Sequence, residues 1–396
     1  MGTESNIKSI TPGPRILIAI ARTAITPINA LCELIDNSID GFINAERLGH
    51  KIENPTITIT IPSKQDIDSG VGALIIEDNG PGMDADTAIN AVTAGYSGQD
   101  NPRDNLGLFG MGFNISSGKL GRTTILKSAR KEDKTGSKIT INLPDLVKTG
   151  SFEVPEDKFE KPNPNYSGTI IQIQDWWPQG DPNYNFIIKL ATTNKNSIRE
   201  QIGRIYSTKI RDGLSIIIAD KPVEPFEHCR WLENRFVLNN GEKIPAYFKV
   251  DEVIGRELRC TNCFELVTNN SEKCPTCDNT SFKEFKNRIY GWLGIQRIAH
   301  STNYGIDLIR NGRLIRQWEK EAFFEWKNPD NPEESIKDYP IDPGYYLGGR
   351  IIGEVHLDFV PVDFLKTNFQ QTSLAWLDAI SFLRGTTSLQ PARAAG

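Results

Sequence analysis

The sequence predicts an α+β protein of two domains, with a small insertion in the second domain. The chain has 396 residues, more than one ordinary hydrophobic core holds, and its 38% hydrophobic and 24% charged residues are typical of globular proteins. The first half contains both helical and strand patterns, whereas residues 200–385 contain mostly strand patterns. We therefore expect a first domain over residues 1–190, a second over 195–390, and the insertion over 256–284.

The charge balance argues against binding nucleic acid by bulk positive charge. The 45 Lys and Arg residues face 50 Asp and Glu residues, a net charge of −5, which leaves only a local basic patch open. The N-terminal MGTESNIKSITPGPR lacks the layout of a signal peptide, and no apolar run of about 18 residues predicts a membrane span. We expect a cytoplasmic protein without a membrane partner, in which cysteines serve metals more often than disulfides.

The stretch LCELIDNSIDG, residues 31–41, predicts an amphipathic helix that starts near Thr26-Pro27 and ends near Gly41. At 100° per residue, Glu33, Asn37 and Asp40 share one face. That face lacks the Lys and Arg residues of a typical solvated surface. A carboxylate and an amide one turn apart suit a hard cation and a polarised water. A solvated helix face is the alternative, and this stretch alone leaves it open.

A strand that ends on an acid follows. The segment VGALIIEDNGPGM, residues 71–83, predicts a buried strand over 73–77 with Asp78 at its end. Gly80 and Gly82 allow the backbone to approach a flat ligand. An ordinary Asn-Gly turn would explain the glycines but not the carboxylate.

Glycines also precede a second helix. In NLGLFGMGFNISSGKLG, residues 105–121, Gly107, Gly110 and Gly112 lie before a helix expected over 113–120. Backbone N–H groups at such a helix start can face phosphate oxygens. No Gly-Lys-Ser/Thr follows, so this is not a Walker loop. Finally, SGTIIQIQ, residues 167–174, predicts a strand that opens on Gly168-Thr169.

In this order, the four segments resemble the ATP-binding domain of the gyrase, heat-shock chaperone, histidine kinase and MutL (GHKL) superfamily. The matching motifs are E-x-x-x-N-x-x-D, D-x-G-x-G, G-x-x-G-x-G and a late G-T on a strand. ELIDNSIDG, EDNGPGM and GLFGMGF most resemble the microrchidia (MORC) branch and its prokaryotic relatives. Each motif is weak singly, but the ordered set is specific. The resemblance covers about residues 10–180 and implies a two-layer α/β sandwich of the GHKL (Bergerat) type.

The resemblance also implies a role for each motif residue. Glu33 would orient or deprotonate the water that attacks the γ-phosphate, and Asn37 would bind Mg²⁺. Asp78 would accept a hydrogen bond from the adenine amino group, with Thr169 supporting it through water. The other implied contacts are Asp40 as a pocket-shaping residue, Gly80, Gly82 and Met83 around the base, and Gly107, Phe109, Gly110, Met111, Gly112 and Phe113 in the lid over the phosphates. Lys119 would either reach phosphate or lie solvated on its helix.

The second half contains a hairpin signal. GIDLIRNGRLIRQW, residues 305–318, alternates apolar residues and breaks at Asn311-Gly312. GHKL ATPases of the gyrase, MutL and MORC kind carry a similar R-N-G-R hairpin in a "transducer" domain, which also sends a lysine into the ATP site. PVDFLKTNFQQTSL, residues 361–374, resembles the segment with that lysine, so Lys366 is the candidate γ-phosphate sensor. A surface lysine at a helix start is the alternative.

Four of the six cysteines form two Cys-x₂-Cys pairs. Cys260 and Cys263 are separated by two residues, as are Cys274 and Cys277, and ten residues lie between the pairs. Four thiolates can hold Zn²⁺ tetrahedrally with no open position, which predicts a structural site and not a catalytic one. A redox dithiol is the alternative, and the duplicated pair argues against it. Whether this zinc ribbon braces its domain or grips a partner stays open.

These features predict an ATP hydrolase with ATP, Mg²⁺ and Zn²⁺ as cofactors. Its slow turnover would drive a nucleotide-gated homodimer, a clamp or switch acting on DNA, which by family analogy would serve genome or antiviral defence. The alternatives are a heat-shock-chaperone-like ATPase that acts on client proteins and a nucleotide-binding module without turnover. A histidine kinase would need a phosphoacceptor histidine before residue 30, and none is present.

Overall fold

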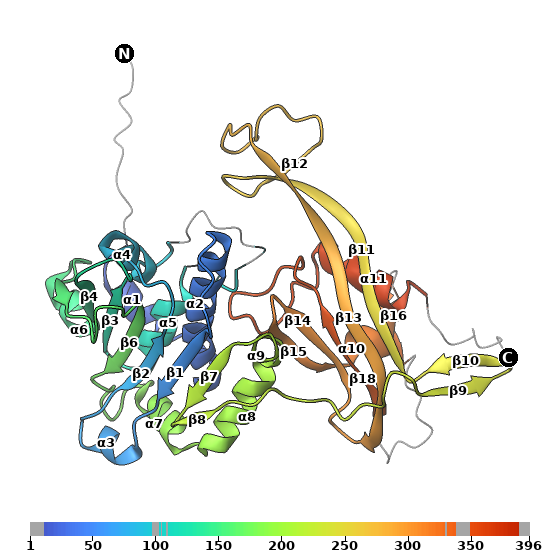
Figure 1. Ribbon diagram of the computed structural model, residues 1–396, viewed down its shortest axis with the longest axis horizontal. Coiled ribbons are helices and arrows are strands. Elements are labelled where there is room, and N and C mark those ends of the chain that lie inside the picture. The colour runs from blue at the N-terminus through green and yellow to red at the C-terminus, as the bar shows by residue number, and fades with distance from the viewer. Residues whose placement is uncertain are drawn as a thin grey trace. The chain divides into compact units, whose positions relative to one another are not determined.

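The computed structural model describes residues 12–96, 103, 105–107, 110–328, 331–337 and 349–387. These residues form two compact units, shown in Figure 1. The first unit contains the described residues up to 96, 110–199 and 213–223. The second contains residues 103, 105–107, 200–212 and those from 224 onward. Each unit has its own sheet, and the domain boundaries expected from the sequence stay predictions.

The first unit is a mixed eight-stranded sheet covered by helices. Its only parallel pair among the described residues is β1 with β7; the other neighbours are antiparallel. The strand order is β5 (Glu156–Phe159), β4 (Gly136–Asn142), β3 (Thr123–Ala129), β6 (Gly168–Gln174), β2 (Leu74–Asp78), β1 (Thr56–Thr60), β7 (Ser215–Ile218) and β8 (Lys221–Pro222). The expected strands over 73–77 and 167–174 are therefore present as β2 and β6, neighbours in this sheet.

Helices α2 (Pro27–Arg47) and α5 (Gly112–Leu120) pack against each other and against this sheet. The side chain of Thr26 caps α2 by accepting the N–H of Asn29, as the expected helix start requires. The remaining helices are α1 (Arg15–Ile20), α3 (Lys64–Asp68), α4 (Ala85–Val92), α6 (Leu143–Thr149), α7 (Tyr184–Thr192) and α8 (Lys195–Ile205), the last of which runs from the first unit into the second.

The expected end of α2 at Gly41 is wrong. The helix continues to Arg47, because Phe42 and Ala45 continue its apolar face and are buried. Nothing lies within 4 Å of where a Cβ at Gly41 would be, so this glycine meets no close neighbour. Tertiary packing of the apolar face therefore outweighs the helix-breaking tendency of one glycine.

The second unit is a six-stranded sheet with its own core. Its order is β12 (Leu266–Val267), β11 (Tyr247–Cys260), β13 (Phe282–His300), β18 (Gly349–His356), β14 (Gly305–Arg310) and β15 (Arg313–Glu319). Leu308, Val355 and Leu357 lie fully buried in this core, and Trp376 of α11 (Leu374–Arg384) packs into it. The other elements are α9 (Ser207–Arg211), α10 (Glu321–Phe324), and the hairpins β9 (Phe236–Asn239) with β10 (Glu242–Pro245) and β16 (Glu325–Asn328) with β17 (Asn331–Lys337).

The expected hairpin at Asn311-Gly312 is confirmed. Strands β14 and β15 pair antiparallel around this turn. Asn311 has φ 50° and Gly312 has φ 76°, and positive φ at both central residues is the geometry that Asn-Gly favours. Whether the second unit is a transducer-type domain stays a prediction.

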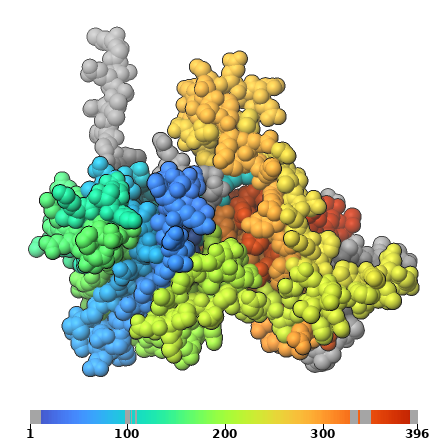
Figure 2. All heavy atoms as spheres, viewed as in Figure 1, coloured from blue at the N-terminus to red at the C-terminus, as the bar shows by residue number. Residues whose placement is uncertain are grey.

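Strands β11 and β13 form a long arm that extends beyond the rest of their sheet (Figure 1). The far end of this arm carries β12 and the four clustered cysteines. In Figure 2 that end is the orange lobe at the top of the second unit.

Candidate functional site

Asp78 ends β2 with its carboxyl held from three sides. The Ser38 hydroxyl donates to Oδ2 at 2.8 Å, and the N–H groups of Gly80 and Thr169 donate to Oδ1 at 2.9 and 3.2 Å. Burial raises the pKa of Asp78 from 3.8 to about 6, although these hydrogen bonds favour the ionised form. The side chain is thus fixed as a hydrogen-bond acceptor at the end of the sheet.

The backbone around Asp78 is packed too tightly for larger residues. Gly82 has φ +70°, and a Cβ there would lie 1.9 Å from the Ala129 carbonyl oxygen. Gly168 has φ +144°, and its Cβ would lie 2.0 Å from the carbonyl oxygen of Asp78. Glycine is therefore needed at both positions, where neighbouring backbone segments meet.

Two serines in this site escaped the sequence analysis. Ser38 lies on α2 directly after Asn37 and holds Asp78. Ser128 of β3 accepts the N–H of Met83 at 2.9 Å, and its hydroxyl lies 3.1 Å from the Gly168 carbonyl oxygen. Nothing in the sequence singles out this serine, because its full burial at a strand position is known only from the structure.

The acidic side of α2 is largely withdrawn from water. Glu33, Asp36 and Asp40 are 5%, 0% and 9% exposed, whereas Asn37 is exposed. A Cβ at Gly112 would lie only 2.3 Å from Oε2 of Glu33, so this carboxylate lies against the first turn of α5. The free N–H groups of a helix start attract negative charge, which suits both a carboxylate and a phosphate.

The described residues of the glycine-rich segment 107–113 are divided between the two units. Gly110 has φ +63°, and its carbonyl accepts the N–H of Gly95 at 2.9 Å. Met111 occupies the N-cap of α5 without a side-chain capping bond, and Phe113 is buried. Gly107 belongs to the second unit, whereas Phe109 lies outside the described residues.

Of the two alternatives for Lys119, the solvated side chain is wrong. This side chain is 9% exposed, and its Nζ donates to the Thr23 carbonyl at 2.7 Å and lies 5.1 Å from the ring centre of Phe186. Burial lowers the pKa of Lys119. A phosphate contact from this residue stays a prediction.

Lys366 is also not the surface lysine of the alternative interpretation. It is 5% exposed and has φ +53° in a short loop, and α11 begins only at Leu374. The loop is closed by backbone hydrogen bonds between Asp363 and Asn368 at 2.8 Å and from Lys366 to Asp363 at 3.0 Å. Its role as a phosphate sensor stays a prediction.

The four cysteines converge as their spacing predicts. Their sulfurs all lie within 4.8 Å of one another, with Cys260 and Cys277 3.5 Å apart and Cys263 and Cys274 3.4 Å apart. Four sulfurs at about 2.3 Å from a tetrahedral zinc ion would be about 3.8 Å apart, close to these separations.

The two Cys-x₂-Cys turns have the same backbone geometry. In each, the residue after the second cysteine, Phe264 or Asp278, has positive φ and donates its N–H to the carbonyl of the first cysteine, at 3.1 and 3.0 Å. Around the sulfurs, the Asn279 amide and the Asn262 N–H both contact Sγ of Cys260 at 3.4 Å. Paired knuckles with N–H groups aimed at sulfur fit a closed, structural zinc site.

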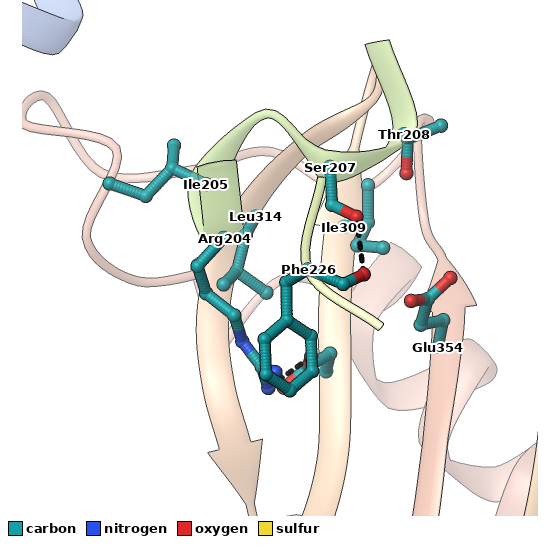
Figure 3. A pocket seen from close by; sticks show the side chains of 9 residues that line it. Arg204, Ile205, Ser207, Thr208, Phe226, Ile309, Leu314 and Glu354 are labelled. Carbon is teal, nitrogen blue, oxygen red and sulfur yellow. Dashed lines mark hydrogen bonds and ion pairs between the residues drawn. The ribbon is translucent and has the colours of Figure 1, made fainter. Parts of the chain in front are cut away.

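A pocket in the second unit, shown in Figure 3, contains none of the predicted site residues. Its charges are paired: Arg204 contacts Asp307 at 2.5 Å and stacks 3.6 Å from the ring centre of Phe226, and Arg211 contacts Glu354 at 2.6 Å. These pairs attach α8 and α9 to strands β14 and β18. We interpret this cluster as structural ion pairs, of which Arg204 with Asp307 is buried and Arg211 with Glu354 is partly buried.

Comparison with known proteins agrees with this geometry. Residues 25–168 match the family model described as histidine kinase-, DNA gyrase B- and HSP90-like ATPase. This stretch is therefore similar to the ATP-binding domain of the GHKL superfamily. Within that class, the chain is similar to the microrchidia proteins, which confirms the resemblance inferred from the four motifs.

Three relatives illustrate the extent of the match. Protein MICRORCHIDIA 5 of Arabidopsis thaliana is 32% identical over 162 residues, 41% of this chain and 22% of that protein. Protein MICRORCHIDIA 7 of the same plant is 27% identical over 184 residues, 44% and 24% of the two chains. The MORC family CW-type zinc finger protein 3 of Mus musculus is 27% identical over 150 residues, 37% and 14%. The match thus spans under a quarter of each relative's length.

Among the described residues, no helix combines the length and the apolar composition that a membrane crossing requires.

Proposed function

We propose that the first unit binds Mg-ATP and hydrolyses it slowly. The observation that carries this proposal is the buried carboxyl of Asp78, which is held in place by Ser38, Gly80 and Thr169 at the end of β2. Asp78 would accept the adenine amino group, and Gly80, Gly82 and Met83 would line the base. The match to an ATPase family over these residues supports the assignment.

The chemistry would centre on the polar face of α2. Glu33 would orient or deprotonate the attacking water, and the N–H groups at the start of α5 would face the phosphates. Asn37, exposed one turn from Glu33, would offer its side-chain oxygen to Mg²⁺, and Asp40 would shape the pocket. When bound, the metal ion would supply charge neutralisation for the phosphates, which phosphoryl transfer needs more than covalent chemistry.

Calorimetry with Mg-ATP and a phosphate-release assay test this site. Asp78→Ala should abolish detectable binding, because it removes the adenine acceptor. Glu33→Ala should keep binding but lower phosphate release by about 100-fold or more, since the base acts on water and not on adenine. Glu46→Ala, an exposed acid on the same helix, is the matched control and should do neither. Unchanged turnover in Glu33→Ala would remove Glu33 from the mechanism.

We further propose that nucleotide closes a homodimer that acts on DNA as a clamp or switch. The similarity to microrchidia proteins favours this function over a chaperone that acts on protein clients. Light scattering with and without a non-hydrolysable ATP analogue tests the dimer, and an unchanged mass contradicts it. A gel shift with long duplex DNA, set against suppression of a client protein's aggregation, separates the two functions.

A further inference from the structure

A short segment that leads into the lid is held by the second unit. Residues 103 and 105–107, here called the lid-base segment, belong to that unit, although the described chain before and after them belongs to the first. The side-chain amide of Asn311 donates to the carbonyls of Arg103 and Asn105 at 2.7 and 3.1 Å. Arg310 also donates to the Asn105 carbonyl at 3.1 Å. The R-N-G-R turn thus fixes this segment through its backbone.

The side chain of Arg103 contacts the arm formed by β11 and β13. Its guanidinium contacts the Glu257 carboxylate at 2.5 Å and the Asn287 side-chain oxygen at 3.0 Å, and it lies 5.4 Å from the ring centre of Phe285. The Arg103 and Glu257 side chains are only 12% and 20% exposed. An ion pair this withdrawn from water, with extra hydrogen bonds, is specific in geometry and costly to break.

The same carboxylate continues to the zinc ribbon. Arg259 contacts Glu257 at 2.7 Å, and its Nη1 donates to the Phe264 carbonyl at 2.9 Å. Phe264 directly follows Cys263 and has φ 63°, so this carbonyl belongs to the first cysteine knuckle. The Phe264 ring also lies 5.4 Å from the Phe285 ring. One acid and one arginine therefore separate Arg103 from the metal-binding turn.

We propose that Arg103 is a positioning residue that couples the nucleotide lid to the zinc ribbon, so that nucleotide binding and zinc retention strengthen each other. Ordering of the lid by nucleotide would hold the lid-base segment, and with it Arg103, in contact with Glu257. Glu257 in turn fixes Arg259 against the first knuckle. Because such coupling is reciprocal, an intact zinc site would also favour the ordered lid. The coupling rests on the proposed nucleotide function and gives the zinc ribbon a role in it.

The first experiment measures zinc transfer from the zinc-loaded full chain to a chromogenic chelator, with and without a saturating non-hydrolysable ATP analogue. We expect the analogue to slow zinc release by about fivefold or more in the wild-type protein. Arg103→Gln and Glu257→Gln should remove this dependence while each still binds one zinc ion. Arg256→Gln breaks the exposed pair with Glu284 on the same strands and should keep it. Arg103→Lys, which keeps the charge but not the fork geometry, should give an intermediate ratio.

The second experiment does not depend on nucleotide. Hydrogen exchange of the backbone amides at 105–107 is compared between zinc-loaded and chelated wild-type protein, and then in Arg103→Gln. Zinc removal should speed exchange at these amides only when Arg103 is present. The coupling is overturned if zinc removal leaves their exchange unchanged, or if the analogue binds but slows zinc release equally in wild type and Arg103→Gln. If calorimetry detects no nucleotide binding, the proposed function fails, and the exchange data still decide the link between ribbon and segment.

Discussion

At the scale of single residues, the carboxyl of Asp78 combines its proposed role in binding adenine with a cost to stability. Its pKa is about 6 in the folded protein against 3.8 as the ordinary value, because burial disfavours the charged form. The folded state therefore keeps a proton that the unfolded chain releases, and stability from this group falls as pH rises from about 4 to about 6 and stays low above that.

Asp78→Asn should separate these two effects. Asparagine keeps an oxygen for the N–H groups of Gly80 and Thr169 but has no charge to bury. We expect the free energy of unfolding of Asp78→Asn, taken relative to wild type, to be about 2–3 kcal/mol higher at pH 8 than at pH 4. We also expect the variant to bind Mg-ATP more weakly. Chemical unfolding at both pH values, followed in parallel with calorimetry, measures this. If the difference in the free energy of unfolding between variant and wild type is the same at both pH values, Asp78 does not titrate in this range.

At the scale of elements, α2 shows which features of a helix the sequence pattern predicts and which it does not. The polar and apolar faces and the Thr26 cap were readable from the sequence, whereas the end of the helix was not, because burial of Phe42 and Ala45 decides it. The structure predicts that Gly41→Ala stabilises the protein by about 0.5–1 kcal/mol, since alanine is the better helix former and its Cβ meets no atom within 4 Å. Thermal unfolding with unchanged nucleotide binding tests it, and a loss of stability would mean that the helix ends near Gly41.

Other parts of the site depended on contacts that no spacing reveals. The motifs indicated Glu33, Asp78 and the cysteines because charge, glycine or sulfur recurs there at regular intervals. Ser128 lacks such a signal, since a serine in a strand pattern looks the same whether it faces water or, as here, two backbone groups and the Thr169 hydroxyl. Lys119 was left open for the same reason: the sequence does not show that the Thr23 carbonyl accepts a hydrogen bond from this lysine.

The predicted zinc ribbon is an element with almost no core of its own. Its buried cluster consists of Cys260, Val267 and Cys274, so two of the four candidate metal ligands make up most of it. We expect chelation, or Cys263→Ser, to unfold residues 256–284 locally while the sheet around Leu308 and Val355 stays intact. Hydrogen exchange with and without chelator measures this. Equal protection of the ribbon in both states would mean that its fold does not need a metal.

At the scale of the whole molecule, the two units are not consecutive in sequence, because each is built from several separate segments of the chain. The lid-base segment and residues 200–212 belong to the second unit, whereas residues 213–223 return to the first and place β7 beside β1. A sequence divided at one boundary cannot show this, because each exchanged segment is short and makes its contacts with residues far away in the chain. The chain therefore passes several times from one unit to the other, so the two units are joined by more than one covalent connection.

Lys366 is the residue through which we expect nucleotide to engage the second unit. Because its φ is +53°, Lys366→Gly removes the ammonium group and relieves the backbone, so a lost function would not result from added strain. We predict that Mg-ATP still binds, with affinity reduced by about tenfold from the loss of one charge-assisted contact, and that the non-hydrolysable analogue no longer shifts the mass seen by light scattering. Lys249→Ala, an exposed lysine on β11, is the control and should behave as wild type. Analogue-induced association that survives Lys366→Gly would assign the γ-phosphate sensor to another residue and leave Lys366 with a structural role in its loop.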